Sequence, residues 1–246
     1  MGVLLVRPSV YGHWAWFSFR NIIYIGHKGC VFKMILVKRD FRLLNDMYFV
    51  KYLNTKRIVK LFGCHYRYVM TRLNQLENQG YIQRIDFMIN REIIWCLKKN
   101  GFNLINQIPY YTSKQDKIYH HLACADFYFY LRQQHYNIQY FALDEEISFR
   151  YQGKKHKFRP DILLKVDQWY LVEIDLSNKR FEEKIKKWES YYYSGMYTAR
   201  FDVFPTIYTV SNDVSKVRTI IDRCKTLAFN YAYKDYADVA NNQYKY

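Results

Sequence analysis

The sequence predicts an α+β protein in two parts: a group of N-terminal helices closed by a β-hairpin, then an α/β part with a mixed central sheet. Two patterns predict this order, namely apolar residues at helical spacing over residues 37–78 and β-rich runs over residues 138–177. Half of the 246 residues are hydrophobic, which is enough to fill the cores of one or two domains. The composition excludes a mainly disordered chain, and the low content of 9 Gly and 4 Pro excludes a collagen-like one.

Positive charge is the strongest feature of the composition. The chain has 38 Lys and Arg against 22 Asp and Glu, a formal net charge of +16. This surplus predicts a polyanionic partner, either nucleic acid or an anionic membrane. Membrane insertion is not expected, because Arg7, His13, Arg20 and Lys28 interrupt the most apolar region and leave no run of about 18 apolar residues.

Residues 1–33 show no clear periodicity. We expect them to be an arm or an over-extended start, with Met34 as the biological first residue; an ordinary N-terminal strand is the alternative. Charges are spread through this region and no small-residue cleavage site follows it, so a signal peptide is not expected. The cytoplasm is the expected location.

The helical pattern begins after Met34. Phe41, Leu44, Met47 and Val50 recur every three positions and predict an amphipathic helix within residues 37–53. A second, short helix is expected to begin at a Thr55 cap and to end at Gly63.

A third helix is expected over residues 65–78, with Val69, Leu73 and Leu76 facing inward. Residues 81–82 and 93–95 then flank a polar turn near residues 90–91 and predict a two-stranded hairpin. Three helices followed by a hairpin indicate a winged helix-turn-helix over residues 34–100.

In such a module the third helix enters a major groove and the hairpin lies on the backbone. Residues 34–100 hold 13 Lys and Arg against 5 Asp and Glu, or +8, whereas residues 101–246 hold 21 against 17, only +4. This distribution favours double-stranded DNA over the alternatives, a protein-binding or RNA-binding module. The expected DNA contacts are Arg67, Arg72, Asn74, Gln75, Arg84 and Arg91.

Residues 101–114 are expected to include a short helix and a connector, and residues 115–246 to form the second domain. Helical periodicity returns over residues 115–134, followed by β-rich runs at 140–143, 147–150, 162–166 and 169–175. Side chains alternate along a strand, so Glu173 and Asp175 share a face of the last run. Asp161 joins them if the hairpin has a three-residue loop centred on Asp167, and points away if the turn has two residues.

Carboxylates grouped on one face repel each other unless a cation neutralises them, and hard oxygen ligands suit Mg²⁺ or Mn²⁺. The alternative is a solvated acidic face. Lys184 lies in one stripe with Trp188, Tyr191 and Tyr192 on the next predicted helix, pointing back at the sheet. Its alternative role is a snorkelling lysine at the edge of the core.

The five cysteines are widely spaced and predict neither a disulfide framework nor a paired zinc site. His120, His121 and Cys124 lie within about one helical turn, and two of them could contact one metal ion. Without a second ligand pair in the sequence, buried structural residues are the preferred interpretation.

The residues Arg159-Pro160-Asp161 and Glu173-Ile174-Asp175 resemble the PD-(D/E)xK core of restriction-endonuclease-like nucleases. Together with the winged-helix start, the His120-His121 helix and the run from Lys184 to the tyrosines, they are similar to the replication-relaxation family of plasmid and conjugative-element proteins, which MOBC-type relaxases resemble. The likeness extends over about residues 37–210. It departs from the nuclease pattern at Asp175, where lysine is usual.

This resemblance implies that Asp161 and Glu173 bind Mg²⁺ or Mn²⁺ and that Asp175 is an extra ligand or orienting group. In some of these nucleases the usual lysine lies on the following helix, and the resemblance implies that Lys184 takes this place. It also implies that His120 acts as a general acid or base or contacts phosphate. A satisfied histidine between helix and sheet is the alternative for His120. Glu146 is a weaker candidate ligand.

The expected function is that of a plasmid or mobile-element protein, active in conjugation, mobilization or replication, that binds origin DNA and nicks it with a divalent metal. Other relaxosome proteins are candidate partners. A covalent tyrosine mechanism through Tyr191, Tyr192 or Tyr193 is less favoured, because aromatic packing explains these residues in a chain with 26 tyrosines. The rival is a non-catalytic replication initiation or transcription regulator whose nuclease-like domain has decayed.

Overall fold

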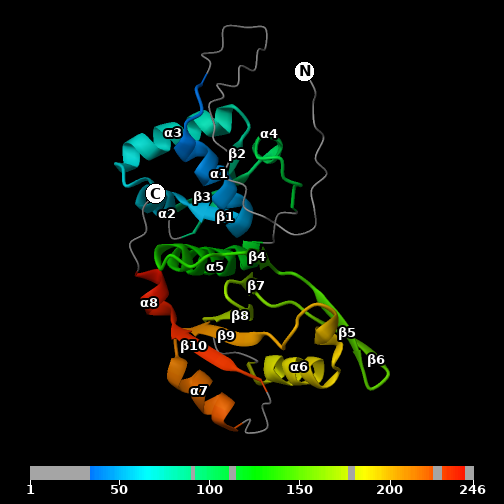
Figure 1. The fold of residues 1–246 in the computed structure, drawn as a ribbon. Coiled ribbons are helices and arrows are strands. Elements are labelled where there is room, and N and C mark those ends of the chain that lie inside the picture. Colours follow the sequence, from blue (N-terminus) through cyan, green and yellow to red (C-terminus); the bar gives the residue numbers. More distant parts are fainter. Residues whose placement is uncertain (1–33, 90–91, 111–114, 177–180, 224–228, 242–246) are drawn as a thin grey trace, which may run out of the picture.

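A computed structural model of the protein describes residues 34–89, 92–110, 115–176, 181–223 and 229–241. Figure 1 shows three layers along its length: the N-terminal elements at one end, α5 across the middle, and a larger sheet covered by α6 and α7 at the other end. In chain order the elements are α1 (Lys38–Val50), β1 (Tyr52–Asn54), α2 (Thr55–Phe62), α3 (Tyr66–Asn78), β2 (Ile82–Ile89), β3 (Glu92–Leu97), α4 (Lys99–Leu104), α5 (Gln115–Gln133), β4 (Tyr140–Leu143), β5 (Ile147–Tyr151), β6 (Lys154–Phe158), β7 (Ile162–Lys165), β8 (Trp169–Asp175), α6 (Phe181–Tyr193), the 3₁₀ helix η1 (Met196–Ala199), β9 (Thr206–Ser211), α7 (Val214–Arg223), β10 (Tyr231–Asp235) and α8 (Tyr236–Ala240).

The N-terminal helices bury the faces that their periodicity predicts. Leu44, Met47 and Val50 of α1 are fully buried, as are the three inward residues expected on α3. The strands β1, β3 and β2 form an antiparallel sheet in that order, and Ile89 of β2 pairs with Glu92 of β3. The polar turn expected near residues 90–91 lies outside the described residues.

Two local details differ from the sequence-based expectation. The first helix ends at Val50, because Lys51 adopts a positive φ of 65° and the next three residues form β1 against β3. The cap of α2 is Asn54, whose side chain accepts a hydrogen bond from the backbone N–H of Arg57, and not Thr55. Thr55 instead lies inside the helix and accepts a hydrogen bond from the buried Trp95 indole.

The second sheet is mixed, with the strand order β10-β9-β8-β7-β4. Its strands β8, β9 and β10 are parallel, whereas β4, β7 and β8 are antiparallel. Val172 and Ile174 pack in the core that includes α5, and Leu171 packs on the opposite side with Ile185 and Trp188 of α6. The alternation expected along residues 169–175 is therefore present, and it decides which helix each strand residue faces.

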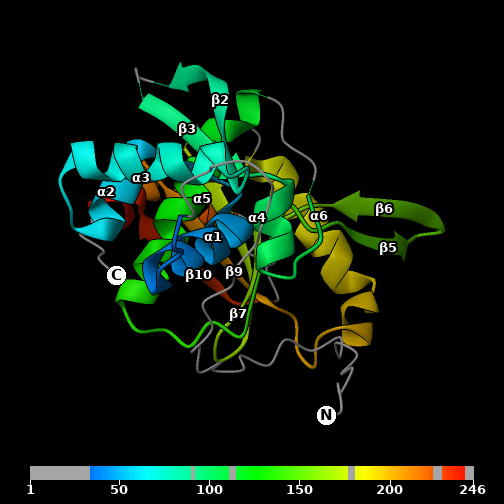
Figure 2. The same ribbon diagram turned by 90° about the horizontal axis from the view of Figure 1, so that it is seen from above.

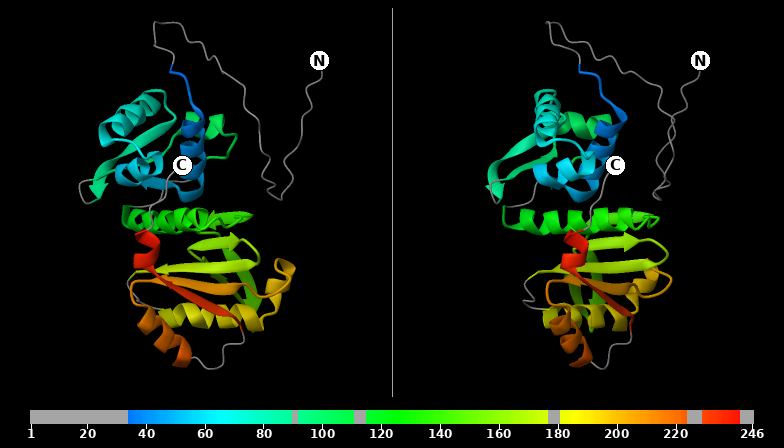
Figure 3. Two further views of the ribbon diagram at one scale, coloured as in Figure 1. Left: turned by 60° about the vertical axis from the view of Figure 1, so that its left-hand side comes forward. Right: turned by 90° about the vertical axis from the view of Figure 1, so that its left-hand side faces the viewer.

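The central helix α5 is buried on nearly all sides. Residues 121–129 are all buried, because β1 and β3 cover one side of the helix and the large sheet covers the other (Figure 3). No helix in the described ranges is long and apolar enough to cross a membrane.

Three ion pairs join the N-terminal elements to the rest of the protein. Arg57 binds Asp126 of α5 at 2.5 Å, Arg132 of α5 binds Asp46 of α1 at 2.5 Å, and Lys51 binds Asp144 at 3.1 Å. Together with a hydrophobic cluster that continues from α1 to β8, they hold the two sheets on either side of α5.

Strands β5 and β6 form a separate antiparallel ribbon that projects sideways from the protein (Figure 2). Its turn residues Gln152 and Gly153 both have positive φ, which is typical of a two-residue hairpin turn. The sequence analysis expected β5 but not β6.

Candidate functional site: an acidic pair bridged by lysine

The β7–β8 hairpin has the register that brings Asp161 beside Glu173. Ile162 pairs with Val172 and Lys165 pairs with Trp169, so the loop between them has three residues centred on Asp167. This confirms the odd register, one of the two alternatives left open by the sequence. The backbone N–H of Ile174 donates to Oδ2 of Asp161 at 2.8 Å, which fixes the carboxylate just before β7 begins.

Lys184 reaches this acidic pair from α6. Its Nζ donates to Oε2 of Glu173 at 2.5 Å and lies 3.9 Å from Oδ2 of Asp161. The buried Ile185 and Trp188 anchor α6 on the sheet and so direct Lys184 toward the strand carboxylates. The predicted convergence of the two acids and the lysine is present.

His120 approaches Asp161 from the opposite side. Its Nε2 lies 2.8 Å from Oδ1 of Asp161, so the aspartate lies between a histidine of α5 and the lysine of α6. The neighbouring His121 points elsewhere, with its Nε2 3.0 Å from Oδ2 of Asp144, which Lys51 also binds. The two histidines therefore belong to different clusters.

The charges of the site are strongly coupled. Burial raises the pKa of Glu173 well above its usual value, and the negative charge of Asp161 raises it further against the opposing effect of Lys184. For Asp161 burial also acts to raise the pKa, but the contacts with His120 and Lys184 outweigh it and lower the pKa. Burial acts to lower the pKa of Lys184, yet the charges of Glu173 and Asp161 raise it above its usual value. The site favours ionised Asp161 beside a charged ammonium, and a further cation would favour ionisation of Glu173.

Asp161 and Glu173 have the chemistry to bind a hard cation. Mg²⁺ is commonly held by one or two carboxylates together with water and substrate phosphates. Within the described part of the chain, no group of three or more His, Cys, Asp and Glu side chains is arranged to hold a metal ion. A cation at this position would therefore have Asp161 and Glu173 as its carboxylate ligands and would need water or phosphate for the rest of its coordination. Asp175 is buried on the same strand face, and its charge helps to raise the pKa of Lys184.

Two other groups named by the sequence analysis lie in different surroundings. Glu146 accepts from Arg159 at 2.7 Å and pairs with Lys157 at 3.3 Å, so it neutralises the base of the β5–β6 ribbon. Tyr191 packs against Phe149 and Phe158, in keeping with the packing role preferred from sequence.

The six residues expected to contact DNA lie in different surroundings. Arg67, Asn74 and Gln75 are exposed on α3 as predicted. Arg84 is also exposed, but its guanidinium donates to Asn74 at 3.0 Å and covers the ring of Trp95, so it lies against α3. Arg91 is outside the described residues.

Arg72 does not face solvent as expected. Its side chain is only 13% exposed and forms a two-point ion pair with the fully buried Asp40 of α1, with Nε 3.0 Å from Oδ1. The same guanidinium donates to the backbone carbonyl of Ile35 at 2.8 Å. Helical periodicity placed Arg72 on the polar face but did not identify a buried partner 32 residues away.

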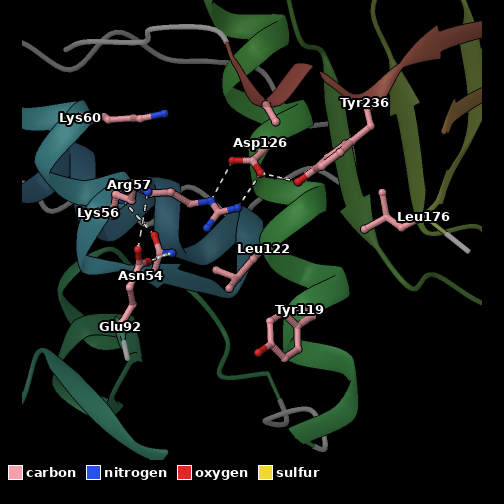
Figure 4. Close-up of a pocket in the computed structure, with 11 residues that line it drawn as sticks. Asn54, Lys56, Arg57, Lys60, Glu92, Tyr119, Leu122, Asp126, Leu176 and Tyr236 are labelled. Atoms are coloured by element: carbon pink, nitrogen blue, oxygen red, sulfur yellow. Dashed lines mark hydrogen bonds and ion pairs between the residues drawn. The ribbon is translucent and has the colours of Figure 1, made fainter. Parts of the chain in front are cut away.

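A cleft of about 340 Å³ lies between α2 and α5, close to the end of β8 (Figure 4). Asp126 closes one side of it, where its carboxylate accepts from Arg57 at 2.8 and 2.5 Å and from the Tyr236 hydroxyl at 2.7 Å. Lys56 and Lys60 lie along its α2 side, and Leu176 follows the acidic strand β8. The sequence analysis missed this cleft because its lining residues come from five elements far apart in the chain.

Comparisons with known proteins identify a family. No curated protein matches the sequence. Protein VC1899 from Vibrio cholerae, a solved structure, aligns with 82% of this chain and 48% of its own, at 11% identity and a TM-score of 0.31; this chain thus spans about half the length of that protein. The model of the replication-relaxation family matches residues 44–207, about two thirds of the chain. The chain therefore belongs to the replication-relaxation family.

Proposed function

We propose that this protein binds double-stranded DNA of a plasmid or mobile-element origin and cleaves one phosphodiester with a divalent metal. The observation that carries the proposal is the meeting of Asp161, Glu173 and Lys184 at one end of the neighbouring strands β7 and β8. Membership of the replication-relaxation family supports a DNA substrate.

The N-terminal elements support a winged helix as the DNA-binding domain, over residues 34–100. Their order is helix, strand, two helices and hairpin, with β1 completing a small antiparallel sheet. In this domain α3 is the recognition helix, and Arg67, Asn74 and Gln75 are its contacts with DNA. The net charge of +8 over these residues supplies the attraction to the phosphate backbone.

Residues 115–246 form the nuclease-like domain in this proposal. Asp161 and Glu173 would hold Mg²⁺ or Mn²⁺, which when bound polarises the scissile phosphate and lowers the pKa of an attacking water. Lys184 stabilises negative charge that develops on the phosphate, because its raised pKa keeps it protonated. His120 is positioned by Asp161 to transfer a proton to or from the reacting oxygen.

One observation favours a non-catalytic alternative, in which the protein is a DNA-binding initiation or transcription regulator. Lys184 already donates to Glu173 and lies near Asp161, so the protein's own cation is a partner of the acidic pair. In this alternative the ion pair is structural, and DNA binding is sensitive to salt but indifferent to divalent metal.

Nicking of supercoiled DNA carrying the cognate origin distinguishes the two functions. With Mg²⁺ the wild-type protein should produce open circles, and excess chelator should abolish them. Asp161→Asn should bind the same DNA with unchanged affinity but nick it on the order of a hundredfold or more slowly. Asp167→Asn is the matched control, because Asp167 is an exposed carboxylate in the turn of the same hairpin. Equal, background-level nicking by wild type and Asp161→Asn would leave the regulator as the function.

A further inference from the structure

Three basic side chains of the β5–β6 ribbon gather on one of its faces, whereas Lys154, which pairs with Tyr151, lies on the other face. Arg150 pairs directly with Lys155 across the two strands, and Ser148 pairs with Lys157. Directly opposed residues point to the same side of a ribbon, so these three basic side chains share one face, and all four residues are exposed.

The other face anchors the ribbon to the protein. Phe149 and Phe158 are buried against Tyr191 of α6. Their ring centroids lie 5.1 and 5.4 Å, respectively, from that of Tyr191. This packing leaves the basic face turned to solvent, and Figure 2 shows the ribbon projecting away from the sheet.

The opposed Arg150 and Lys155 are unfavourable for the ribbon itself. Like charges directly across an antiparallel pair destabilise it. Over the ranges that the structure describes, the only carboxylate paired with the basic residues of the ribbon is Glu146, which binds Lys157 and Arg159 at its base. An external polyanion would remove the repulsion between Arg150 and Lys155.

The ribbon leads directly into the acidic site. Only Arg159 and Pro160 separate its last residue, Phe158, from Asp161, so the two Cα atoms are at most about 10 Å apart. Each strand of the ribbon spans roughly 17 Å, and a two-stranded ribbon of this kind fits the major groove of B-DNA. DNA bound along the ribbon would therefore extend to the acidic pair.

We propose that the outward face of the β5–β6 ribbon, formed by Arg150, Lys155 and Lys157, binds the phosphate backbone of duplex DNA and directs it to Asp161. The inference deepens the proposed function by assigning a second DNA contact, separate from α3 and next to the acidic site. It is carried by the three basic residues gathered on one exposed face, the apolar anchor and the short link to Asp161.

The test is the double variant Arg150→Gln with Lys155→Gln in the full chain. Its affinity for a short labelled DNA duplex should fall on the order of tenfold near physiological salt, and the slope of log K against log salt should become shallower by about 1.8, or about 0.9 per lost phosphate contact. Because the substitutions remove a like-charge pair, the melting temperature should equal or exceed that of wild type.

Matched controls separate this contact from a general effect of charge. Lys186→Gln with Lys216→Gln removes the same charge from exposed positions on α6 and α7, and should change affinity and slope far less. Arg150→Lys with Lys155→Arg preserves the charge and should bind like wild type, which keeps the test informative if the glutamine variant folds poorly.

An unchanged slope in the glutamine variant, or an equal loss in the lysine control pair, would overturn the ribbon proposal. Loss of binding to duplex RNA or to anionic lipid vesicles with unchanged DNA binding would overturn it as well. The binding test of the ribbon does not depend on nicking. A wild-type protein that binds DNA without cutting it would contradict the catalytic proposal but not the ribbon proposal.

Discussion

The ammonium of Lys184 lies 2.5 Å from Oε2 of Glu173, which makes a helix residue the direct partner of a buried strand carboxylate. Glu173 is 2% exposed, and its burial raises its pKa well above the usual value against the opposing effect of Lys184. The state of the acidic pair therefore depends on how α6 packs on the sheet, and this dependence can be tested.

Lys184→Met should abolish nicking without weakening DNA binding. Removal of the ammonium eliminates the charge that stabilises the developing anion, with an expected loss on the order of a hundredfold in rate. Since Lys184 is about a third exposed, screening by solvent limits the loss in free energy of unfolding to about 1–2 kcal/mol. Single-turnover nicking, duplex affinity and urea unfolding measure the three quantities. Lys186→Met on the exposed side of α6 is the control and should leave all three unchanged.

Arg67→Ala should weaken DNA binding and Arg72→Ala should lower stability, although both residues belong to α3. Arg67 is exposed, so its loss should weaken DNA binding and reduce the salt slope by about 0.9 without a change in stability. Arg72→Ala leaves the buried Asp40 without its guanidinium partner and should cost about 3 kcal/mol of unfolding free energy. Fluorescence anisotropy and chemical denaturation compare the pair. Equal losses of affinity at unchanged stability would show that Arg72 also faces DNA.

Asp144 should make stability depend on pH in the acid range. Burial acts to raise its pKa, but the hydrogen bond to His121 and the charge of Lys51 outweigh this effect and hold the pKa well below its usual range. A lowered pKa in the folded state contributes stability that is full above the unfolded value, near 3.9, and is lost as pH falls below it. Asp144→Asn should therefore cost about 2–3 kcal/mol at pH near 7, with a difference from wild type that shrinks below pH of about 4.

Asparagine is the suitable replacement because Asp144 has a positive φ of 54°, which asparagine tolerates well. Asp202→Asn, an exposed site, serves as the control for the same change of charge. A constant difference between Asp144→Asn and wild type across the acid range would contradict the assignment of the pH dependence to Asp144.

Asp126→Asn should loosen the junction beside the cleft. Its carboxylate binds the largely buried Arg57 at two points and also accepts from Tyr236, so its neutralisation should cost about 3 kcal/mol. Tyr236→Phe removes a single hydroxyl from the same network and should cost about 1 kcal/mol. Thermal unfolding should rank the variants in that order. A larger loss from Tyr236→Phe would mean that α8, and not α2, holds Asp126 in place.

Local patterns determined much of the fold, because helical and strand periodicities report which face of an element is buried. They predicted α1, α3 and α5, the buried residues Val69, Leu73 and Leu76 of α3, and the alternation that places Glu173 on one face of β8. The strands β1 and β9 were not predicted, because local patterns do not identify a partner strand that is distant in the chain. β1 has three residues, and β9 pairs in parallel with distant chain, so neither carries a local signal of its partner.

The sequence by itself determined the charge of the protein, its helices, the family resemblance and the set of candidate acids. Only the tertiary structure decided which of two registers the β7–β8 hairpin adopts, and that His120 rather than His121 meets Asp161. It also showed that Arg72 pairs internally with Asp40. These outcomes depend on contacts between elements far apart in the chain, and the periodicity of one segment carries no information about the partner that packs against it.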